Sequence, residues 1–478
     1  MYIPTIGLEI HMHGKTRTKM FCACPNNFEE NNPNINTCPI CLGHPGALPV
    51  ANEEAVKATV RLGLALGSEI ATRCHFDRKS YFYPDLPKGY QISQYDHPIV
   101  SGGQLKGIRI TRVHLEEDAG RLMHEAPQGG THKKDATYVD YNRGGAPLLE
   151  LVTEPDIKNA EEAVVFAREL QRIARYLGVS NADMEKGHMR VEANISISKD
   201  PGKFGTKVEV KNINSFRAVH DAIEYELKRQ EEVLERGEKI VQETRGWNDV
   251  KHITESQRSK ESAHDYRYFP DPDLPPLDLS HWDLEHMKHE LPELPETKRQ
   301  RFVFLFGLTS EQADILIDDM EMAQFFEEAT SELTERVSPP QYQLLFNYFT
   351  SDLRGLINAN GVSLKESKVS PEHFAHLVAL VQEGKLSSRL AKDLLVSMMK
   401  TGEDPETLMK ESGVRIISGA DELAGVIDEI ISKNPKAVED YKKGKGNALQ
   451  FLVGQGMART KGQASPDALR ELFAKKLA

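Results

Sequence analysis

Membrane and export signals are missing from this sequence. It contains no run of eighteen apolar residues, which a membrane-spanning helix needs. Its first residues, MYIPTIGLEIH, lack the basic start and the apolar stretch of a secretory signal. Internal repeats, low-complexity tracts and a Walker A motif are absent too. We therefore expect a cytoplasmic protein, and its 478 residues, 39% hydrophobic and 28% charged, predict roughly two to four globular domains.

The chain as a whole also lacks an excess of positive charge. Its formal charge of -12 at pH 7 argues against indiscriminate binding to nucleic acids. The last stretch differs, because ten Lys or Arg and four Asp or Glu lie between Lys433 and Ala478, an excess of +6. Its helical segments are joined by Gly-containing loops whose basic residues suit a phosphate backbone and read no base sequence. A solubilising surface is the alternative role of these residues, Lys442, Lys443, Lys445, Arg459 and Lys461.

Cysteine is scarce and unevenly distributed. Four of the five cysteines form a C-x-C pair and, thirteen residues later, a C-P-I-C pair in a loop rich in Pro and Asn: Cys22, Cys24, Cys38 and Cys41. Closely spaced thiols in a cytoplasmic chain are more typical of tetrahedral zinc ligands than of disulfides. The spacing therefore predicts a closed, structural zinc site, with a redox pair or unliganded thiols as alternatives. The fifth, Cys74, is expected to be a packed or partly exposed thiol.

Three consecutive acids occur in the segment RVHLEEDAG (residues 112–120). Glu116, Glu117 and Asp118 follow a strand-like run, so water, arginine or a metal ion must offset their charge. Strand alternation puts His114 and Glu116 on one face and Glu117 on the other. Apolar residues occur on both faces, so the sequence leaves open which glutamate turns inward. A solvated strand end is the alternative to a metal site.

Two further segments offer partners for these acids. Residues 5–12 (TIGLEIHM) alternate between polar and apolar, which predicts a strand with Glu9 and His11 projecting side by side. Residues 147–152 (PLLELV) form an otherwise apolar strand that contains Glu150. Because burying an unpaired carboxylate is costly, Glu150 should have a cation or a proton. A pocket of these side chains and the acidic pair suits Mg²⁺, which takes few protein carboxylates and keeps waters and phosphate oxygens.

An aromatic and cationic segment lies between the cysteines and the acids. Residues 76–94 read FDRKSYFYPDLPKGYQISQ and include Lys79, Tyr81 and Lys88. Lysine acts as a point charge for phosphate, and aromatic rings stack on bases, so this segment is a candidate pocket for phosphate and base. A surface loop held by its prolines is the alternative.

The remaining patterns predict how the chain is divided. Alternating strands with one polar face, such as residues 189–197, imply an antiparallel sheet open to solvent or ligand on one side. Helices are expected after Asn52, Asn159 and Ser215, which can act as N-caps. Prolines crowd residues 270–295, which predicts a boundary rather than a strand or helix. Beyond this boundary the apolar residues repeat with a helical period.

Several long motifs occur in a fixed order along the chain: GLEIH, the cysteine loop, FDRKSYFYPDLPKGYQISQ, HLEEDAG, DYNRGGAPLLELVTEPD, EVKNINSF and DYRYFPDPDLPPL. With these motifs the chain resembles the GatB family, the B subunits of tRNA-dependent amidotransferase (GatCAB) complexes, over essentially its whole length. The resemblance implies an α+β fold: an N-terminal cradle domain with a mostly antiparallel sheet, an all-helical domain and a small helical YqeY-like tail. The implied domains are residues 1–291, with a zinc loop at 22–41, then 292–405 and 406–478.

The resemblance also implies an activity. The family is an ATP-dependent carbon–nitrogen ligase with glutamine as amido donor: ATP phosphorylates the side-chain carboxylate of Glu on tRNA(Gln) or Asp on tRNA(Asn), and ammonia displaces the phosphate. Implied cofactors are ATP, Mg²⁺ and structural Zn²⁺, and implied partners are a glutaminase (A) subunit, a small C subunit and mischarged tRNA, without a membrane. The choice between the two tRNAs stays open. The rival hypothesis is a zinc-stabilised RNA-binding scaffold without chemistry of its own.

Site residues carry over by motif. The implied catalytic set is Glu9, His11, Glu116, Glu117 and Glu150, with magnesium at His11, Glu117 and Glu150. The acid of the Glu116/Glu117 pair that does not bind metal would face the ammonia path. Implied contacts of ATP or the acyl phosphate are Lys79, Tyr81 and Lys88, and the four cysteines correspond to a zinc site that some members keep. One departure is visible, because members commonly read LRCDANVS where this chain has MRVEANIS at residues 189–196.

Overall fold

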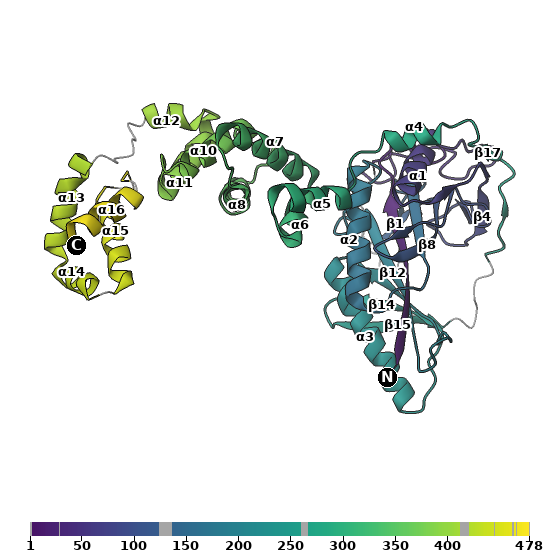
Figure 1. Cartoon of the computed structure of the whole chain (residues 1–478). Helices are drawn as coiled ribbons and strands as arrows, with labels where there is room; N and C mark the ends of the chain where they lie inside the picture. Colours follow the sequence, from purple (N-terminus) through teal and green to yellow (C-terminus); the bar gives the residue numbers. More distant parts are fainter. Residues whose placement is uncertain are drawn as a thin grey trace. The chain divides into compact units, whose positions relative to one another are not determined.

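Two compact units make up the structure, a computed structural model that describes residues 2–27, 29–123, 136–259, 266–411, 420–443, 445–460, 463–464 and 466–477. The first unit is Met1–Pro295 and the second is Glu296–Ala478 (Figure 1). Within the described ranges every strand belongs to the first unit, and the second unit is helical. The predicted α+β fold is therefore confirmed, whereas the division into three domains at residues 291 and 405 remains a prediction.

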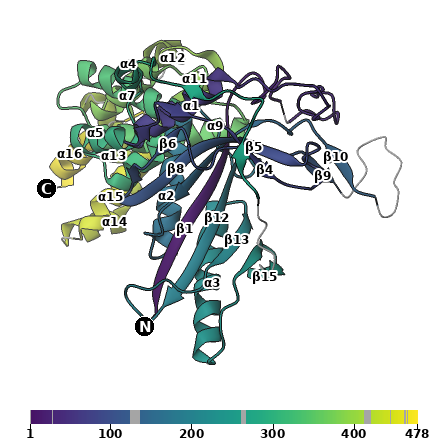
Figure 2. The same cartoon turned by 90° about the vertical axis from the view of Figure 1, so that its right-hand side faces the viewer.

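The first unit carries the strands β1 (Ile3–His13), β2 (Glu69–Ile70), β3 (Arg73–Cys74), β4 (Asp77–Ser80), β5 (Tyr90–Ser93), β6 (Val100–Ser101), β7 (Gln104–Leu105), β8 (Ile108–Glu117), β9 (Arg121–Met123), β10 (Tyr138–Asp140), β11 (Pro147–Thr153), β12 (Met189–Ser198), β13 (Val208–Ile213), β14 (Glu243–Asn248), β15 (Ile253–Ser259), β16 (Phe269–Pro270) and β17 (Leu277–Asp278). Ten of these strands form one sheet in the order β15-β14-β13-β12-β1-β11-β8-β6-β2, with β7 paired to β8. Every pairing in this sheet is antiparallel except that of β13 with β14. The purple strand β1 lies near the middle of the sheet, beside β12 (Figure 2).

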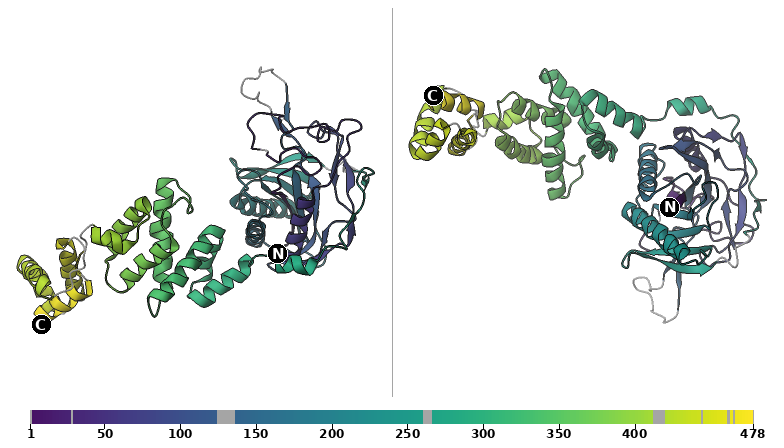
Figure 3. Two further views of the ribbon diagram at one scale, coloured as in Figure 1. Left: turned by 90° about the horizontal axis from the view of Figure 1, so that it is seen from above. Right: turned by 60° about the horizontal axis from the view of Figure 1, so that its bottom comes forward.

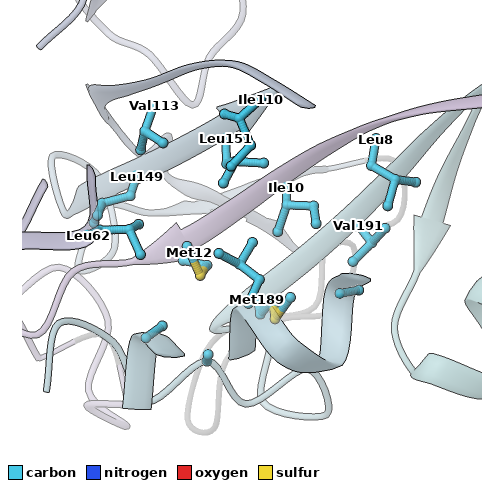
Figure 4. Close-up of a cluster of buried hydrophobic side chains, with 14 of the residues drawn as sticks. Leu8, Ile10, Met12, Leu62, Ile110, Val113, Leu149, Leu151, Met189 and Val191 are labelled. Atoms are coloured by element: carbon cyan, nitrogen blue, oxygen red, sulfur yellow. The ribbon is translucent and has the colours of Figure 1, made fainter. Parts of the chain in front are cut away.

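The central strands form because their apolar residues alternate. On β1, Ile6, Leu8, Ile10 and Met12 are at most 1% exposed. Residues paired across antiparallel strands share a face, so the partners of β1 on β11 and β12 extend this apolar surface. Figure 4 shows the resulting cluster, in which the labelled side chains are Leu8, Ile10, Met12, Leu62, Ile110, Val113, Leu149, Leu151, Met189 and Val191. The polar residues between them must therefore lie on the opposite face.

The helices of the first unit are α1 (Glu53–Ala65), α2 (Ala160–Tyr176), α3 (Phe216–Glu235) and α4 (Leu284–His289). Three of them begin where their N-caps predict: Asn52 accepts from Glu54 N, Asn159 from Glu162 N and Ser215 from Ala218 N, which satisfies amides that the first turn leaves unpaired. α2 and α3 lie side by side along the sheet (Figures 1 and 3). They cover its apolar face.

The proline-rich stretch at residues 270–295 is more ordered than predicted. Its strand β17 pairs with β3, and β16 pairs with β4 at the edge of a small sheet that also includes β5. Helix α4 follows, with the Asp283 carboxylate accepting a hydrogen bond from His286 N. The prediction that this stretch contains no strand or helix was therefore wrong, because its short strands satisfy their amides by pairing with distant segments, which local periodicity does not show. The two units do divide at its end.

The second unit contains α5 (Pro295–Phe306), α6 (Ser310–Ile317), α7 (Met320–Arg336), α8 (Tyr342–Asn347), the π-helix η2 (Tyr348–Leu353), α9 (Arg354–Asn360), α10 (Pro371–Gln382), α11 (Ser388–Thr401), α12 (Pro405–Glu411), α13 (Ala420–Lys433), α14 (Pro435–Lys442), α15 (Gly446–Arg459) and α16 (Pro466–Leu477). Its buried apolar residues form two separate clusters, one from Phe302 to Leu408 and one from Leu423 to Leu477. Among the described helices of the whole chain, none combines the length and apolar character that crossing a bilayer requires.

Candidate functional site

A row of ionisable side chains crosses three central strands on the face opposite the apolar cluster. His11 on β1 pairs in register with Glu150 on β11, and Glu150 pairs with His114 on β8. Both imidazole Nε2 atoms lie 3.3 Å from the same Glu150 Oε2 atom. Glu150 is 6% exposed, so this lone carboxylate of an apolar strand is buried between two histidines.

Two more carboxylates complete the cluster. His11 Nε2 lies 3.7 Å from Glu116 Oε1 and 3.8 Å from Glu9 Oε1. Glu116 also accepts a hydrogen bond from Ser93 Oγ at 3.2 Å. One ligand atom from each of Glu9, His11 and Glu150 lies within 4.8 Å of the others, and His114, Glu116 and Glu150 meet the same condition. We call these five side chains, Glu9, His11, His114, Glu116 and Glu150, the carboxylate–histidine cluster.

Glu117 lies elsewhere, and the structure does not bring it to this cluster. Because β8 alternates, Glu117 projects to the other face from Glu116. There its carboxylate forms an ion pair with Lys88 and accepts a hydrogen bond from Ile92 N at 2.9 Å. Both members of this pair line a cavity of about 100 Å³ beside the cysteine loop. Glu116, and not Glu117, therefore lies beside His11 and Glu150.

The electrostatics of the cluster follow from burial and opposite charges. Burial opposes ionisation of Glu150, yet His114 and His11 hold its pKa well below the usual range. Burial likewise opposes the charged imidazolium, but Glu150 raises the pKa of His11 to about 9. Burial and the neighbouring Glu150 raise the pKa of Glu9 to about 7. The cluster therefore retains protons at neutral pH to offset its negative charge.

These residues fit a divalent cation. A cluster that holds extra protons is one in which a metal ion can replace them, because ligands bind metals in their deprotonated forms. Within the described residues, His11 Nδ1 is buried without a hydrogen-bond partner, and Nε2 faces carboxylates. Carboxylates with one imidazole are a hard donor set of the kind that suits Mg²⁺ or Mn²⁺.

The candidate phosphate-binding residues divide between the two faces. Lys79 on β4 has its ammonium 5.0 Å from the centroid of the Tyr266 ring. Although burial opposes its charge, Glu116 in particular raises the pKa of Lys79. Tyr81 stacks near Tyr83, with ring centroids 4.8 Å apart. Lys88 belongs to the Glu117 pair and not to the cluster.

The four cysteines come together as a group, with Sγ atoms within 4.8 Å of one another. All four are free thiols, and those of Cys38 and Cys41 are 3.9 Å apart. Tetrahedral ligands at the usual zinc–sulfur distance are separated by about 3.8 Å, so this spacing fits zinc. Hydrogen bonding from Cys22, despite burial, lowers the pKa of Cys41 to about 5, which favours the thiolate form that binds metals. Cys74 is a packed thiol, 1% exposed.

Sequence reasoning missed charged residues on the neighbouring strands of this face. Arg190 and Glu192 on β12 pair in register with His11 and Glu9. Lys211 on β13 lies 2.8 Å from Glu192 Oε2. The alternation of residues 189–197 was the available signal, because it places Arg190 and Glu192 on the polar face. Only the register across β1 shows which residues they meet.

The basic residues of the tail are exposed. Lys443 pairs with Glu439 at 2.6 Å, Lys445 with Asp440 at 3.0 Å, and Arg459 with Glu429 at 3.0 Å. Lys442 is also exposed, at the end of α14. Lys461 lies outside the described residues. The geometry therefore leaves their predicted role in tRNA binding as a prediction.

Comparison with known proteins agrees with this architecture. Residues 4–285 match a family model described as the GatB/GatE catalytic domain, and residues 324–477 match one described as the GatB domain. Similar proteins are the aspartyl/glutamyl-tRNA(Asn/Gln) amidotransferase B subunits of Carboxydothermus hydrogenoformans and Thermotoga maritima, each 46% identical over 100% of this chain and 99% of the relative. The same subunit of Persephonella marina is 44% identical over 98% of both chains. Since two domain models and full-length relatives all match, this chain belongs to the GatB family of amidotransferase B subunits.

Proposed function

We propose that this chain is the B subunit of a tRNA-dependent amidotransferase and carries its ATP-dependent ligase site. The proposed substrates are Glu attached to tRNA(Gln) and Asp attached to tRNA(Asn). The observation that carries this proposal is the buried row of His11, Glu150 and His114, with Glu9 and Glu116 beside it. A scaffold without chemistry has no use for a carboxylate group that must be kept charged at such a cost.

The reaction has two steps. An oxygen of the substrate carboxylate attacks the γ-phosphorus of ATP, the bond to the β,γ-bridging oxygen breaks, and ADP leaves. Ammonia then attacks the carbonyl carbon of the acyl phosphate, gives up a proton, and phosphate leaves to yield the amide. Phosphoryl transfer of this kind depends on positioning and on neutralising charge, rather than on a covalent intermediate with the protein.

The cluster residues have separate roles in this proposal. Glu9, His11, Glu116 and Glu150 would hold a magnesium ion, which neutralises charge between phosphate oxygens and the substrate carboxylate when bound. His114 holds Glu150 in place through Oε2, the same oxygen atom that His11 approaches. Lys79, whose positive charge Glu116 favours, would bind a phosphate group of the nucleotide. Tyr81 remains a proposed nucleotide contact on the same segment.

Glu117 and Lys88 take a different part. The ion pair that they form lines the cavity beside the cysteine loop, away from the cluster. We assign this pair to the path of ammonia from the glutaminase subunit. The magnesium role predicted for Glu117 passes to Glu116, because only Glu116 lies beside His11.

The other proposed components, zinc, the partner subunits and the basic tail, take no direct part in the reaction. Zinc at Cys22, Cys24, Cys38 and Cys41 would fix the loop that borders the cavity. The glutaminase (A) and small C subunits would complete the complex. The basic residues of the tail, Lys461 among them, would contact the phosphate backbone of tRNA.

A reconstituted assay tests this function. The purified chain, combined with A and C subunits, receives ATP, Mg²⁺, glutamine and either mischarged tRNA. We expect ADP formation and amide formation that both require the mischarged tRNA. A complex that binds tRNA and releases neither ADP nor amidated product would contradict the proposal. Comparing the two tRNAs in the same assay also decides the specificity.

A further inference from the structure

Asp118, a buried carboxylate next to the cluster, has four hydrogen-bond or ion-pair partners in the described part of the chain. Asp118 is 4% exposed and directly follows the two glutamates of β8. Its oxygens accept from His13 Nε2 at 2.7 Å and from Ala119 N at 2.9 Å. Arg143 Nε and Arg190 Nη2 each lie 3.2 Å from it. These contacts join segments from residue 13 to residue 190.

The two arginines around this carboxylate differ in what else they contact. Arg143 also donates to Ala119 O and Gly120 O, both at 3.1 Å, so its guanidinium fastens the turn after β8. Among the described residues, the side chain of Arg190 has one hydrogen bond, from Nη2 to Asp118. A third of the Arg190 side chain is exposed, at 34%. One edge of its guanidinium is therefore anchored, while other N–H groups remain available for a ligand.

Arg190 lies on the site face, one strand beyond His11. It pairs in register with His11 across β1 and β12, and paired residues in adjacent strands share a face. Asp118, despite burial, raises the pKa of Arg190, and Glu192 and Glu116 add to this effect. Arg190 is thus surrounded by acids of the site and stays charged. Lys211, a neighbouring cation on β13, is already paired with Glu192.

We propose that Arg190 binds an oxygen of the phosphoryl group in transfer, and that Asp118 is a positioning residue that holds the guanidinium toward the carboxylate–histidine cluster. A planar guanidinium presents several N–H donors in a fixed fork, so one edge can bind Asp118 while another binds a phosphate oxygen. Such a donor stabilises charge that develops on the equatorial oxygens during transfer. This inference rests on the proposed function and adds a residue to the site.

The test uses the assembled amidotransferase complex with ATP, Mg²⁺ and mischarged tRNA. In Arg190→Gln, we expect kcat for ADP formation to fall by about 10²–10³-fold, as on loss of one preorganised donor to an anionic transition state. The Kd for tRNA should not change. Added guanidinium ion should restore part of the ADP formation in Arg190→Gln, which a loss of folding would not allow. A matched control is Arg109→Gln on β8, which removes an exposed ion pair to Asp156 and should leave kcat unchanged.

Asp118→Asn tests the positioning role. We expect a fall in kcat. The double variant with Arg190→Gln should be no slower than Arg190→Gln alone, because both changes disrupt the same interaction. If Arg190→Gln does not fold, Arg190→Lys decides the question, since lysine keeps the charge beside Asp118 but loses the fork. Unchanged ADP formation in the folded Arg190→Gln or Arg190→Lys variant overturns the inference, as do additive losses in the double variant. If the unmodified complex forms no ADP, the proposed function fails instead.

Discussion

The two units of this protein manage charge in opposite ways. In the first, ionisable side chains are buried and come from distant segments, as with Glu150 between His11 and His114. In the tail of the second, the basic side chains are exposed, as is Lys443, which pairs with Glu439 on the same helix. Buried charges are costly and persist only with several partners, whereas exposed pairs are screened by water and salt. This difference agrees with our proposal, which gives the chemistry to the first unit and contact with polyanions to the second.

The largest effect is expected from Glu150→Gln, which removes the charge at the centre of the buried row. We expect ADP formation by the complex to fall at least about 10²-fold, since the amide cannot balance both histidines or a cation. Binding of tRNA should persist, because the tail is unchanged. ADP release and filter binding measure the two quantities.

Glu154→Gln is a matched control for that variant. Glu154 follows the same strand and accepts from Thr111 Oγ1, outside the cluster. Its replacement should leave ADP formation intact. Full activity in Glu150→Gln would favour the scaffold hypothesis, and the buried charges of the first unit would then no longer indicate chemistry there.

The second prediction concerns the cysteine group. Cys41→Ser should abolish binding of one zinc ion per chain and destabilise the first unit by roughly 3 kcal/mol or more, because metal binding contributes directly to folding. Elemental analysis and thermal unfolding with and without a chelator measure both effects. Cys74→Ser, which changes a buried thiol outside the group, should keep the zinc. Equal zinc contents in the two variants would exclude this site.

A smaller effect is expected in the tail. Replacing Lys442, Lys443 and Lys445 by Gln should weaken binding of tRNA and flatten its salt dependence, by up to about 0.7–0.9 in the log–log slope for each phosphate that a lysine no longer neutralises. ADP formation at saturating tRNA should be unchanged. Lys475→Gln with Lys476→Gln, on α16, removes two positive charges elsewhere in the tail and is the control. Identical slopes in both variants would indicate that Lys442, Lys443 and Lys445 form a solubilising surface.

The smallest effect tests a hydrogen-bonded carboxylate of the second unit. Asp404 lies 2.6 Å from His376 Nδ1 and accepts from Glu406 N at the start of α12. Although burial opposes it, the hydrogen bond from His376 lowers the pKa of Asp404 below its usual 3.8. Its stabilising effect is therefore present above about pH 4 and is lost as pH falls through the folded-state pKa.

Asp404→Asn should therefore cost about 1 kcal/mol in unfolding of the full chain at pH 7, and less below pH 3. Asp393→Asn, on the exposed side of α11, should cost nothing measurable. A loss that is independent of pH would assign the effect to packing instead of charge.

Much of the site was predictable from local pattern. The alternation of β1 placed Glu9 and His11 side by side, and the N-caps Asn52, Asn159 and Ser215 marked three helices. The cysteine spacing indicated a group that the structure brings together. These features depend on residues close in sequence, where periodicity and hydrogen bonding to the adjacent backbone leave few alternatives.

The choice between Glu116 and Glu117 was different. Alternation showed that they face opposite sides, but both sides of β8 carry apolar residues, so only packing against the other strands decides which side holds the cluster. Tertiary packing also decides the position of Arg190, because its hydrogen bond to Asp118 joins residues 72 positions apart in the sequence. Register across a sheet is set by many weak contacts at once, and no short segment encodes it.

The sequence by itself determined the α+β class, the cysteine group, the candidate acids and the basic tail, because composition and short-range periodicity specify these. The tertiary structure decided that His11, Glu150 and His114 form one row, that Lys88 pairs with Glu117, and that Arg190 is anchored beside the cluster. The physical reason is that a buried charge needs partners at hydrogen-bond distance, and in this protein those partners come from strands that meet only when the sheet is complete.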